Sequence, residues 1–359
     1  MSSTAPSAAP TGVLLVNLGT PDAPETAPVR RYLRQFLSDR RVLTLPGPLR
    51  WLLLNLVILP TRPAKSAEAY RKVWTPEGSP LLVHSKALAA GVADALGADY
   101  RVELAMRYGQ PSIERGLAAL EEAGVDRIVV LPLFPQYASS VTASVSAEVM
   151  RVLDHNGDFP PIEILGAFHD DPGFIAPWAT LAGPDLAAFG ADHVLFSFHG
   201  LPEDQIRASD PTGSHCLSSE GCCDAPGPSL RRCYRAQCYG TAAALAEALG
   251  LGQDQYSVSF QSRLGPRPWI RPFTDEVLPS LSESGVKRLA VFCPSFVADC
   301  LETLEEIGIR LREQWTEDGG DALWLSPCPN GDRGFAEGVA GWIRASSEGR
   351  QVLRRTHPA

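Results

Sequence analysis

The chain lacks an excess of basic residues, and this absence excludes a large class of partners. Its 359 residues include 32 Lys and Arg against 41 Asp and Glu, a formal net charge of −9. A nucleic-acid-binding face needs clustered basic charge to neutralise phosphates. We therefore expect no nucleic-acid partner.

Long hydrophobic runs and an export signal are missing as well. The most apolar stretch, WLLLNLVIL at residues 51–59, is far shorter than the roughly 20 residues needed to cross a bilayer. The opening MSSTAPSAAP has neither a basic start nor an apolar segment, so we expect a flexible tail and a cytoplasmic protein. Residues 51–59 predict one of two structures. They form either a buried helical turn or an exposed apolar lip, which would contact a hydrophobic ligand or, peripherally, a membrane.

The sequence has 8 cysteines but no C-x2-C pair. Without an export signal, we expect reduced thiols or metal ligands instead of disulfides. Five cysteines share the spacing C-x5-C-C-x9-C-x4-C and define a Cys-rich segment. Four thiolates hold zinc or an iron–sulfur cluster, and the missing C-x2-C disfavours a zinc ribbon; unliganded thiols are the third reading. The five are Cys216, Cys222, Cys223, Cys233 and Cys238.

Residues 194–202, VLFSFHGLP, combine a buried strand with a reactive side chain. The run from Val194 to Phe198 predicts a strand of a parallel sheet, and the glycine and proline that follow turn the chain. His199 falls at the carboxyl end of this strand, where open α/β sheets form their clefts. A His at that position is either a proton-transfer group or a strand-end residue held by a backbone carbonyl.

Three sequence pairs recur in the same order in both halves. VLLVNLGTP from residue 13 matches VLFSFHGLP from residue 194, AMRYG matches FQSRLG, and LEEAGVDRIVV from residue 120 matches LSESGVKRLAV from residue 281. Three ordered matches predict a duplicated α/β unit, each half with a parallel sheet covered by helices on both faces. Leu18 stands where the second half has His199, so such a strand does not need a His to end it. Helices are expected over residues 27–37, 81–97, 241–250, 298–315 and 334–345.

Acidic residues gather where a strand at residues 289–292 leads into the helix that begins ADCLETLEEI. Its first turns hold Asp299, Glu302, Glu305 and Glu306, and the helix dipole alone favours acids there. In a doubly wound sheet the same helix start faces the His199 loop. A His and carboxylates that converge there can transfer protons or hold a divalent metal transiently.

Two loops after strands suit a flat, polar-edged ligand. They are LPLFPQYASSVTAS, residues 131–144, and FQSRLGPRPWIRPFTDE, residues 260–276. Aromatic rings with a few hydroxyls describe a cofactor-sized cleft, although hydroxyls equally serve as caps and turn residues. The candidate ligand contacts are Tyr137, Ser139, Ser140, Thr142, Arg263 and Trp269.

Five motifs together resemble the ferrochelatase family, whose members insert Fe(II) into protoporphyrin IX. They are LVNLGTP, LPLFPQYASSVTAS, SFHGLP, QSRLGPRPWIRPFTDE and ADCLETLEEI, in family order over about residues 12–345. The resemblance implies a chelatase-like α/β fold of two similar Rossmann-like domains with parallel sheets and an active site between them. The implied domains are residues 11–168, joined by a closing helix at about 331–346, and residues 169–330 with a Cys-rich insert at 209–238. Residues 1–10 and 347–359 would be flexible tails.

The resemblance also implies residue roles. His199 corresponds to the family's invariant His, Glu302 to its essential Glu, Asp299 to a nearby Asp and Tyr137 to a porphyrin contact. His199 would remove the pyrrole protons, while Glu302 and Asp299 would guide Fe(II) or relay protons. In the reverse assignment, His199 is the ligand that delivers the metal. The chain departs from the pattern at Cys300, where some members have a second His.

Two further segments gain a meaning from the resemblance. Residues 51–59 resemble the apolar active-site lip that faces the membrane, which makes Trp51 and Leu52 porphyrin and membrane contacts. The Cys-rich insert resembles an internal segment that holds a [2Fe-2S] cluster in several members. The implied ligands are Cys216, Cys222, Cys223 and Cys233; cluster-free relatives also have a Cys at Cys238, which is therefore the alternate.

The expected function is ferrochelatase, a lyase that completes haem biosynthesis with protoporphyrin IX and Fe(II) as substrates. A chelatase for another metal or tetrapyrrole, such as a cobaltochelatase or a coproporphyrin ferrochelatase, is the alternative enzyme. A non-catalytic haem or iron–sulfur sensor is the alternative of another class, and it would need neither His199 nor Glu302. We expect a monomer, although the sequence does not determine the oligomeric state.

Overall fold

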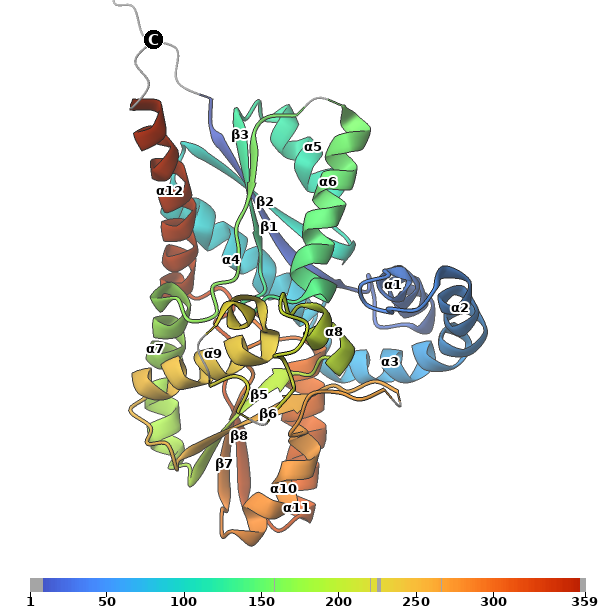
Figure 1. The fold of residues 1–359 in the computed structure, drawn as a ribbon, viewed down its shortest axis with the longest axis vertical. Coiled ribbons are helices and arrows are strands. Elements are labelled where there is room, and N and C mark those ends of the chain that lie inside the picture. The colour runs from blue at the N-terminus through green and yellow to red at the C-terminus, as the bar shows by residue number, and fades with distance from the viewer. Residues whose placement is uncertain (1–8, 158, 220, 225–226, 266, 356–359) are drawn as a thin grey trace, which may run out of the picture.

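The computed structural model describes residues 9–355 apart from residues 158, 220, 225–226 and 266. Two four-stranded parallel sheets lie one above the other (Figure 1). The first has the order β2-β1-β3-β4, from β1 (Thr11–Thr20), β2 (Tyr100–Gly109), β3 (Arg127–Pro132) and β4 (Ile162–Ile164). The second has the order β6-β5-β7-β8, from β5 (His193–His199), β6 (Tyr256–Gln261), β7 (Arg288–Phe292) and β8 (Ala322–Leu325).

The identical strand order of the two sheets confirms the duplicated α/β unit. β1 and β5 occupy the same place in their sheets, between two parallel neighbours, and their central side chains are buried. Burial on both faces explains why both sequences are runs of apolar residues instead of alternating patterns. One detail of the repeat differs: Arg107 and Gly109 lie inside β2, whereas Arg263 and Gly265 follow the end of β6.

Helices cover the sheets largely where hydrophobic periodicity predicts them. The first half has α1 (Thr26–Ser38), α2 (Gly47–Leu52), η1 (Leu53–Ile58), α3 (Leu59–Val73), α4 (Pro80–Leu96), α5 (Ile113–Glu122), η2 (Ser139–Ala143) and α6 (Ser144–Asn156). The second half has α7 (Pro172–Phe189), α8 (Glu203–Ala208), η3 (Pro228–Arg232), α9 (Tyr234–Ala248), α10 (Thr274–Glu283), η4 (Glu302–Leu311), α11 (Arg312–Glu317) and α12 (Arg333–Arg355). Two helices begin well away from the expected residue: α9 begins at Tyr234, and the helix expected from residue 298 begins at Glu302 as the π-helix η4.

The closing helix α12 packs on α4 of the first half and on α7 (Figure 1). Its approach to α7 is close: a Cβ added at Gly338 would lie 2.4 Å from the carbonyl oxygen of Gly173. Phe335 of α12 joins an apolar core that runs from Val13 in the first sheet to Phe292 in the second. α12 extends to Arg355, past the helix end expected near residue 346. Residues 1–8 and 356–359 of the expected tails lie outside the described residues.

Helices α1, α2 and α3 form a projection at one side of the first sheet (Figure 1). Residues 51–59 lie here in α2 and η1 and at the start of α3. Part of this segment is a buried helical turn and part is an exposed apolar lip, so both predictions from the sequence apply. Leu54 and Leu59 are buried, whereas Trp51 is 60% and Leu56 63% exposed. No helix among the described residues is long and apolar enough to cross a membrane.

Candidate functional site

His199 ends β5, and its main chain is held from both sides. Its N–H donates to Ser295 Oγ (3.1 Å), and its carbonyl accepts a hydrogen bond from the Tyr234 hydroxyl (2.7 Å). The ring nitrogen Nδ1 lies 2.7 Å from the carbonyl oxygen of Gly200. Because a carbonyl can only accept, Nδ1 carries the proton in the neutral ring and Nε2 keeps a free lone pair. The imidazole is therefore set up to act as a base through Nε2.

Gly200 allows the strand end to pack against β6 and the loop that follows it. Its N–H donates to the carbonyl oxygen of Gln261 (2.7 Å). A Cβ at this position would lie 2.9 Å from that oxygen and 3.4 Å from the ring of Trp269. A larger residue would push the chain outward, so the glycine places Trp269 next to the His199 loop, as predicted for a contact of the same cleft.

The π-helix η4 presents Glu302 and Glu306 to this loop. The carbonyl of Glu302 accepts a hydrogen bond from Gln261 Nε2 (2.9 Å), and the Glu306 carboxylate accepts two from Ser262, at 2.9 Å from N and 2.6 Å from Oγ. Burial raises the pKa of Glu306, the Ser262 hydrogen bond opposes this, and the Glu302 charge raises the pKa further. His199 also acts on Glu306 electrostatically, so the imidazole and Glu302 both lie within electrostatic reach of the Glu306 carboxylate. We refer to His199, Glu302 and Glu306 as the cluster.

The first half of the molecule faces the same cluster through α1 and α3. Burial raises the pKa of Tyr32 and of Tyr70, and the negative charge of Glu302 contributes to both shifts. Lys72 of α3 forms an ion pair with Glu305 of η4 at 3.2 Å. Glu302 thus lies at the boundary between the two halves, which an active site between domains requires.

Asp299 is more enclosed than the two glutamates. Its carboxylate accepts hydrogen bonds from Asn330 Nδ2 (2.7 Å) and Thr303 Oγ1 (3.1 Å), and its N–H donates to Asn330 Oδ1 (2.8 Å). These bonds tie the start of η4 to the loop before α12. The geometry favours a supporting role at this residue, and the predicted contribution to metal guidance or proton relay stays a prediction.

The loop after β3 meets the second half of the molecule. The Tyr137 N–H donates to Gln237 Oε1 of α9 (2.6 Å), and Gln136 Nε2 donates to the carbonyl of Pro294 after β7 (3.1 Å). The predicted contacts Ser139, Ser140 and Thr142 follow in η2. The Thr142 hydroxyl is buried with no hydrogen-bond partner among the described residues, which leaves it available to a ligand or a water.

A hollow of about 10 Å³ lies between these loops, with Tyr137, Ser139, Leu201 and Tyr234 in its walls. Two hydrogen bonds link the halves nearby: the Arg267 guanidinium donates to Thr44 Oγ1 (2.8 Å), and Gln205 Nε2 donates to the carbonyl of Arg41 (3.3 Å). Both join the loop between α1 and α2 to the second half of the chain. Neither His199 nor the carboxylates of Glu302 and Glu306 line this small hollow.

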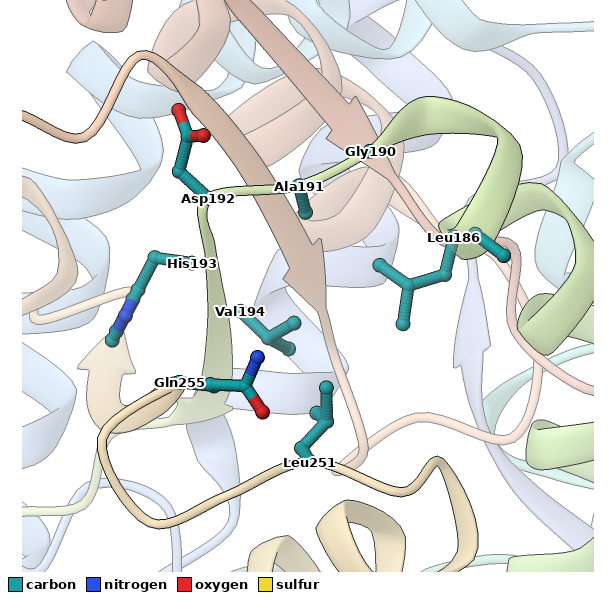
Figure 2. Close-up of a pocket in the computed structure, with 9 residues that line it drawn as sticks. Leu186, Gly190, Ala191, Asp192, His193, Val194, Leu251 and Gln255 are labelled. Atoms are coloured by element: carbon teal, nitrogen blue, oxygen red, sulfur yellow. The ribbon is translucent and has the colours of Figure 1, made fainter.

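A larger hollow of about 160 Å³ lies at the opposite, amino-terminal end of β5 (Figure 2). Leu186, Val194 and Leu251 point into it, while the side chains of Asp192 and His193 point away. It holds none of the predicted site residues, so it does not belong to the cleft.

The other predicted ligand contacts lie at the rim of the site. Arg263 forms a bidentate ion pair with Asp275 (2.9 and 2.8 Å) and lies over the ring of Phe273. This pairing leaves Arg263 poorly placed to bind a substrate carboxylate unless Asp275 releases it. Trp51 and Leu52 are exposed on α2, on the projection.

Four of the five clustered thiols converge in the Cys-rich segment. Hydrogen bonds from Cys223, and more weakly from Cys216, lower the pKa of Cys233 to about 6. The Arg235 guanidinium donates to Cys222 Sγ (3.7 Å) and Cys223 Sγ (3.5 Å). The sulfurs of Cys216, Cys222, Cys223 and Cys233 therefore lie in one neighbourhood with a positive charge beside it.

The remaining cysteines differ from these four. Burial raises the pKa of Cys238, whose thiol is in contact with the Tyr234 hydroxyl. Cys293, Cys300 and Cys328 are also buried with raised pKa values, as inert core thiols are. Among the described residues, no group of three or more His, Cys, Asp or Glu side chains is arranged to hold a metal ion. In this conformation the thiol of Cys233 forms hydrogen bonds with those of Cys223 and Cys216, and Arg235 donates to Cys222 and Cys223.

Sequence reasoning gave no role to several residues that hold the site together: Tyr234, Gln237, Ser295 and Glu306. A signal existed for Glu306, because residues four apart on a helix share a face and Glu302 was already a candidate. For Tyr234 and Gln237 the pattern YRAQC showed an aromatic and an amide one turn apart, but their partners lie in distant loops. Only the fold reveals those partners.

Comparisons with known proteins agree with this geometry. A family model described as Ferrochelatase matches residues 10–347. A ferrochelatase of Coxiella burnetii is 47% identical over 335 residues, 93% of each chain, and one of Azotobacter vinelandii is 51% identical over 329 residues, 91% of this chain and 96% of the relative.

Among solved structures, SirB from Bacillus subtilis with Fe3+ is similar over 95% of this chain and 98% of that one. Its TM-score is 0.55 at 14% sequence identity, so this likeness concerns the fold alone. The family model and the relatives, which extend over nearly the whole length, show that this chain belongs to the ferrochelatase family.

Proposed function

We propose that this protein inserts Fe(II) into protoporphyrin IX to give protohaem, the terminal step of haem biosynthesis. The reaction class is that of a lyase, a porphyrin metal chelatase. The observation that carries the proposal is the cluster of His199, Glu302 and Glu306 at the boundary of the two halves, in a chain of this family. A sensor of haem or iron–sulfur clusters would have no need of a base opposite two carboxylates.

The chemistry requires a base because the porphyrin must lose two pyrrole protons when it binds Fe(II). The sum is porphyrin plus Fe(II) giving haem plus two protons, without any change of oxidation state. His199 Nε2 has the free lone pair that accepts a pyrrole proton, since Nδ1 donates to Gly200. The reverse assignment, in which His199 and Glu302 deliver Fe(II), uses the same lone pair.

Glu306 supports the proton-transfer reading. A carboxyl group whose pKa is raised by burial binds a proton more readily than an exposed one, and Glu306 lies within electrostatic reach of His199. Glu306 and Glu302 on η4 would be the acceptors of protons that leave the imidazole. A π-helix widens the backbone locally and is frequent at functional sites, in agreement with this role for η4.

The porphyrin would lie between the Tyr137 loop, the Trp269 loop and the lip. A pocket for a cofactor-sized ligand has a volume of roughly 300–1,000 Å³, so the porphyrin needs more room than the hollow of about 10 Å³ beside Tyr137 offers. The contacts of Arg267 with Thr44 and of Gln205 with Arg41 are few and lie near the surface, so their separation costs little. The exposed apolar side chains of the lip suit peripheral contact of a cytoplasmic protein with a membrane surface.

We also propose that Cys216, Cys222, Cys223 and Cys233 hold a [2Fe-2S] cluster. Support comes from the convergence of four sulfurs, the low pKa of Cys233 and the guanidinium of Arg235 that offsets thiolate charge. Insertion of Fe(II) involves no redox step, so the cluster would supply structural or regulatory chemistry. Zinc is the competing occupant.

Metal analysis tests the cluster. Protein made anaerobically with ample iron should contain two irons and two acid-labile sulfides per chain, and should be reddish-brown. Cys222→Ser should bleach it, whereas Cys238→Ser, the matched control from the same segment, should leave the colour largely intact. Stoichiometric zinc without labile sulfide would refute the cluster and leave the chelatase proposal unaffected.

The function itself is tested by anaerobic incubation with Fe(II) and protoporphyrin IX, with the visible spectrum followed for haem. Parallel reactions with coproporphyrin and with Co(II) separate this activity from the alternative chelatases. Preferential haem formation from protoporphyrin IX and Fe(II) is the expected result. Faster turnover of another tetrapyrrole or another metal would favour one of the alternative chelatases. The absence of any metallation would refute the proposed activity.

A further inference from the structure

The first turn of α9 contacts the loops of both halves that build the cleft. The Tyr234 hydroxyl donates to the carbonyl of His199 in the second half (2.7 Å), and Gln237 Oε1 accepts from the N–H of Tyr137 in the first half (2.6 Å). In Figure 1, α9 crosses the molecule between the two sheets. Residues three apart share a helix face, so one face of one turn spans the boundary.

Tyr234 closes a ring of three hydrogen bonds around the main chain of His199. Its hydroxyl donates to the His199 carbonyl, the Ser295 hydroxyl donates to the Tyr234 oxygen (2.9 Å), and the His199 N–H donates to Ser295 Oγ (3.1 Å). Each hydroxyl donates one bond and accepts one, so the ring is fully satisfied. Such closed chains of bonds strengthen one another in a buried setting, and Tyr234 is 5% exposed.

Gln237 is fixed in one orientation by its second bond. Its Nε2 donates to the carbonyl of Arg231 (3.0 Å), which turns Oε1 toward the Tyr137 N–H. One turn later, Thr241 Oγ1 accepts from Gln136 Nε2 (3.0 Å), so the contact with the Tyr137 loop continues along the helix. Gln237 is 4% exposed, and its amide has little freedom to find other partners.

We propose that Tyr234 and Gln237 are positioning residues. Together they fix the base, His199, and the porphyrin contact, Tyr137, in the correct relative position across the cleft. Tyr234 acts through His199, and Gln237 acts through Tyr137. The inference rests on the proposed function for what the two loops do, but the coupling itself is independent of it. Reacting groups must be held to within a fraction of an ångström, so one rigid turn that touches both loops serves this purpose.

The two residues should affect different kinetic constants. Tyr234→Phe removes one hydroxyl and should lower kcat about tenfold, the effect of one hydrogen bond of about 1.4 kcal/mol, with KM for porphyrin changed less than about twofold. Gln237→Met keeps the size of the side chain and removes the acceptor. It should raise KM for porphyrin several-fold with kcat nearly unchanged, since Tyr137 contacts the substrate and not the proton.

Controls separate positioning from stability. Tyr256→Phe makes the same chemical change at the far, amino-terminal end of β6 and should leave both constants unchanged. Ser295→Ala should lower kcat as Tyr234→Phe does, and Ser295→Thr, which keeps the hydroxyl, should restore it. The double variant Tyr234→Phe/Ser295→Ala should have a kcat no lower than about that of the poorer single variant, because both residues act on the same peptide. Additive losses, or equal losses in kcat and KM for both α9 variants, would overturn the proposal.

A spectroscopic measurement tests the coupling without reference to activity. In protein labelled with ¹⁵N-histidine, the imidazole signals of His199 are assigned by their loss in His199→Ala. Tyr234→Phe should shift or broaden these signals and leave those of the other His residues in place, while Tyr256→Phe should not affect them. Unchanged His199 signals in Tyr234→Phe would refute the coupling. If wild-type protein metallates no porphyrin but the shift is observed, the proposed function fails and the positioning contact stands.

Discussion

At the scale of single residues, the account depends on what surrounds each ionisable group. His199 keeps a lone pair at Nε2 because Nδ1 bonds a carbonyl, and Glu306 has a raised pKa because it is buried. The carboxylate of Asp299, by contrast, accepts hydrogen bonds from Asn330 and Thr303. Two acidic residues from one stretch of sequence therefore have different environments, and different roles follow from them.

Replacement of Glu302 tests the role of its carboxylate directly. Glu302→Gln keeps the size of the side chain but removes its charge, and we expect kcat to fall at least about a hundredfold, the lower scale for a lost proton-transfer group. Glu313→Gln, on α11 beyond the cluster, is the matched control and should turn over normally. Wild-type kinetics in Glu302→Gln would show that this carboxylate is only an acidic residue near the start of a helix, without a role in the reaction.

His193, at the hollow remote from the cleft, gives a test of pH dependence. Burial lowers its pKa, so below about pH 6.5 the unfolded chain binds a proton that the folded protein resists. This residue's contribution to stability is therefore present above that pH and is lost as the pH falls. The melting temperature of wild type should drop between pH 7.5 and 5.5 by about 1 °C more than that of His193→Gln. Equal drops would show that His193 titrates normally in the folded protein.

At the scale of elements, the segment α2–η1 combines two roles. Leu54 faces the core formed with α1 and α3, whereas Trp51, Leu52 and Leu56 remain in solvent. Several exposed apolar side chains close together mark a contact surface for a membrane or a greasy ligand. The sequence alone left both readings open because an apolar run of nine residues carries no periodicity strong enough to separate its faces.

The two faces of this segment should respond differently to truncation. Replacement of Trp51, Leu52 and Leu56 by Ala should weaken binding to anionic lipid vesicles and to porphyrin, with little change in melting temperature because these side chains are exposed. Leu54→Ala, the control on the buried face, should lower the free energy of unfolding by about 2–5 kcal/mol. Vesicle binding equal to that of wild type in the triple variant, measured by co-sedimentation, would exclude the lip as the membrane contact.

At the scale of the whole molecule, the duplicated architecture was predictable because strand sequences repeat in order and parallel strands buried on both faces leave a strong apolar signal. The location of His199 at a strand end followed from the same pattern. The long-range contacts of α9 were not predictable: Tyr234 contacts His199, 35 positions away in the same half, and Gln237 contacts Tyr137, 100 positions away in the other half. Nothing in a local sequence pattern encodes such pairs.

The contacts between the loop that follows α1 and the second half were also beyond the sequence. They are side-chain contacts, such as that of Arg267 with Thr44, that any polar loop could make. The π-helical form of η4 likewise differs from the α-helix expected there, because a one-residue change in hydrogen-bond register leaves the hydrophobic pattern nearly unaltered.

The most direct test of the account compares porphyrin binding and metal insertion in His199→Ala. The base is lost but the apolar cleft is retained, so protoporphyrin should still bind, with an affinity within about threefold of wild type by fluorescence titration. Haem formation from Fe(II) and protoporphyrin IX under anaerobic conditions should fall by roughly 10²–10⁴-fold, the range for loss of a general base. Near-normal haem formation by this variant would contradict the central claim.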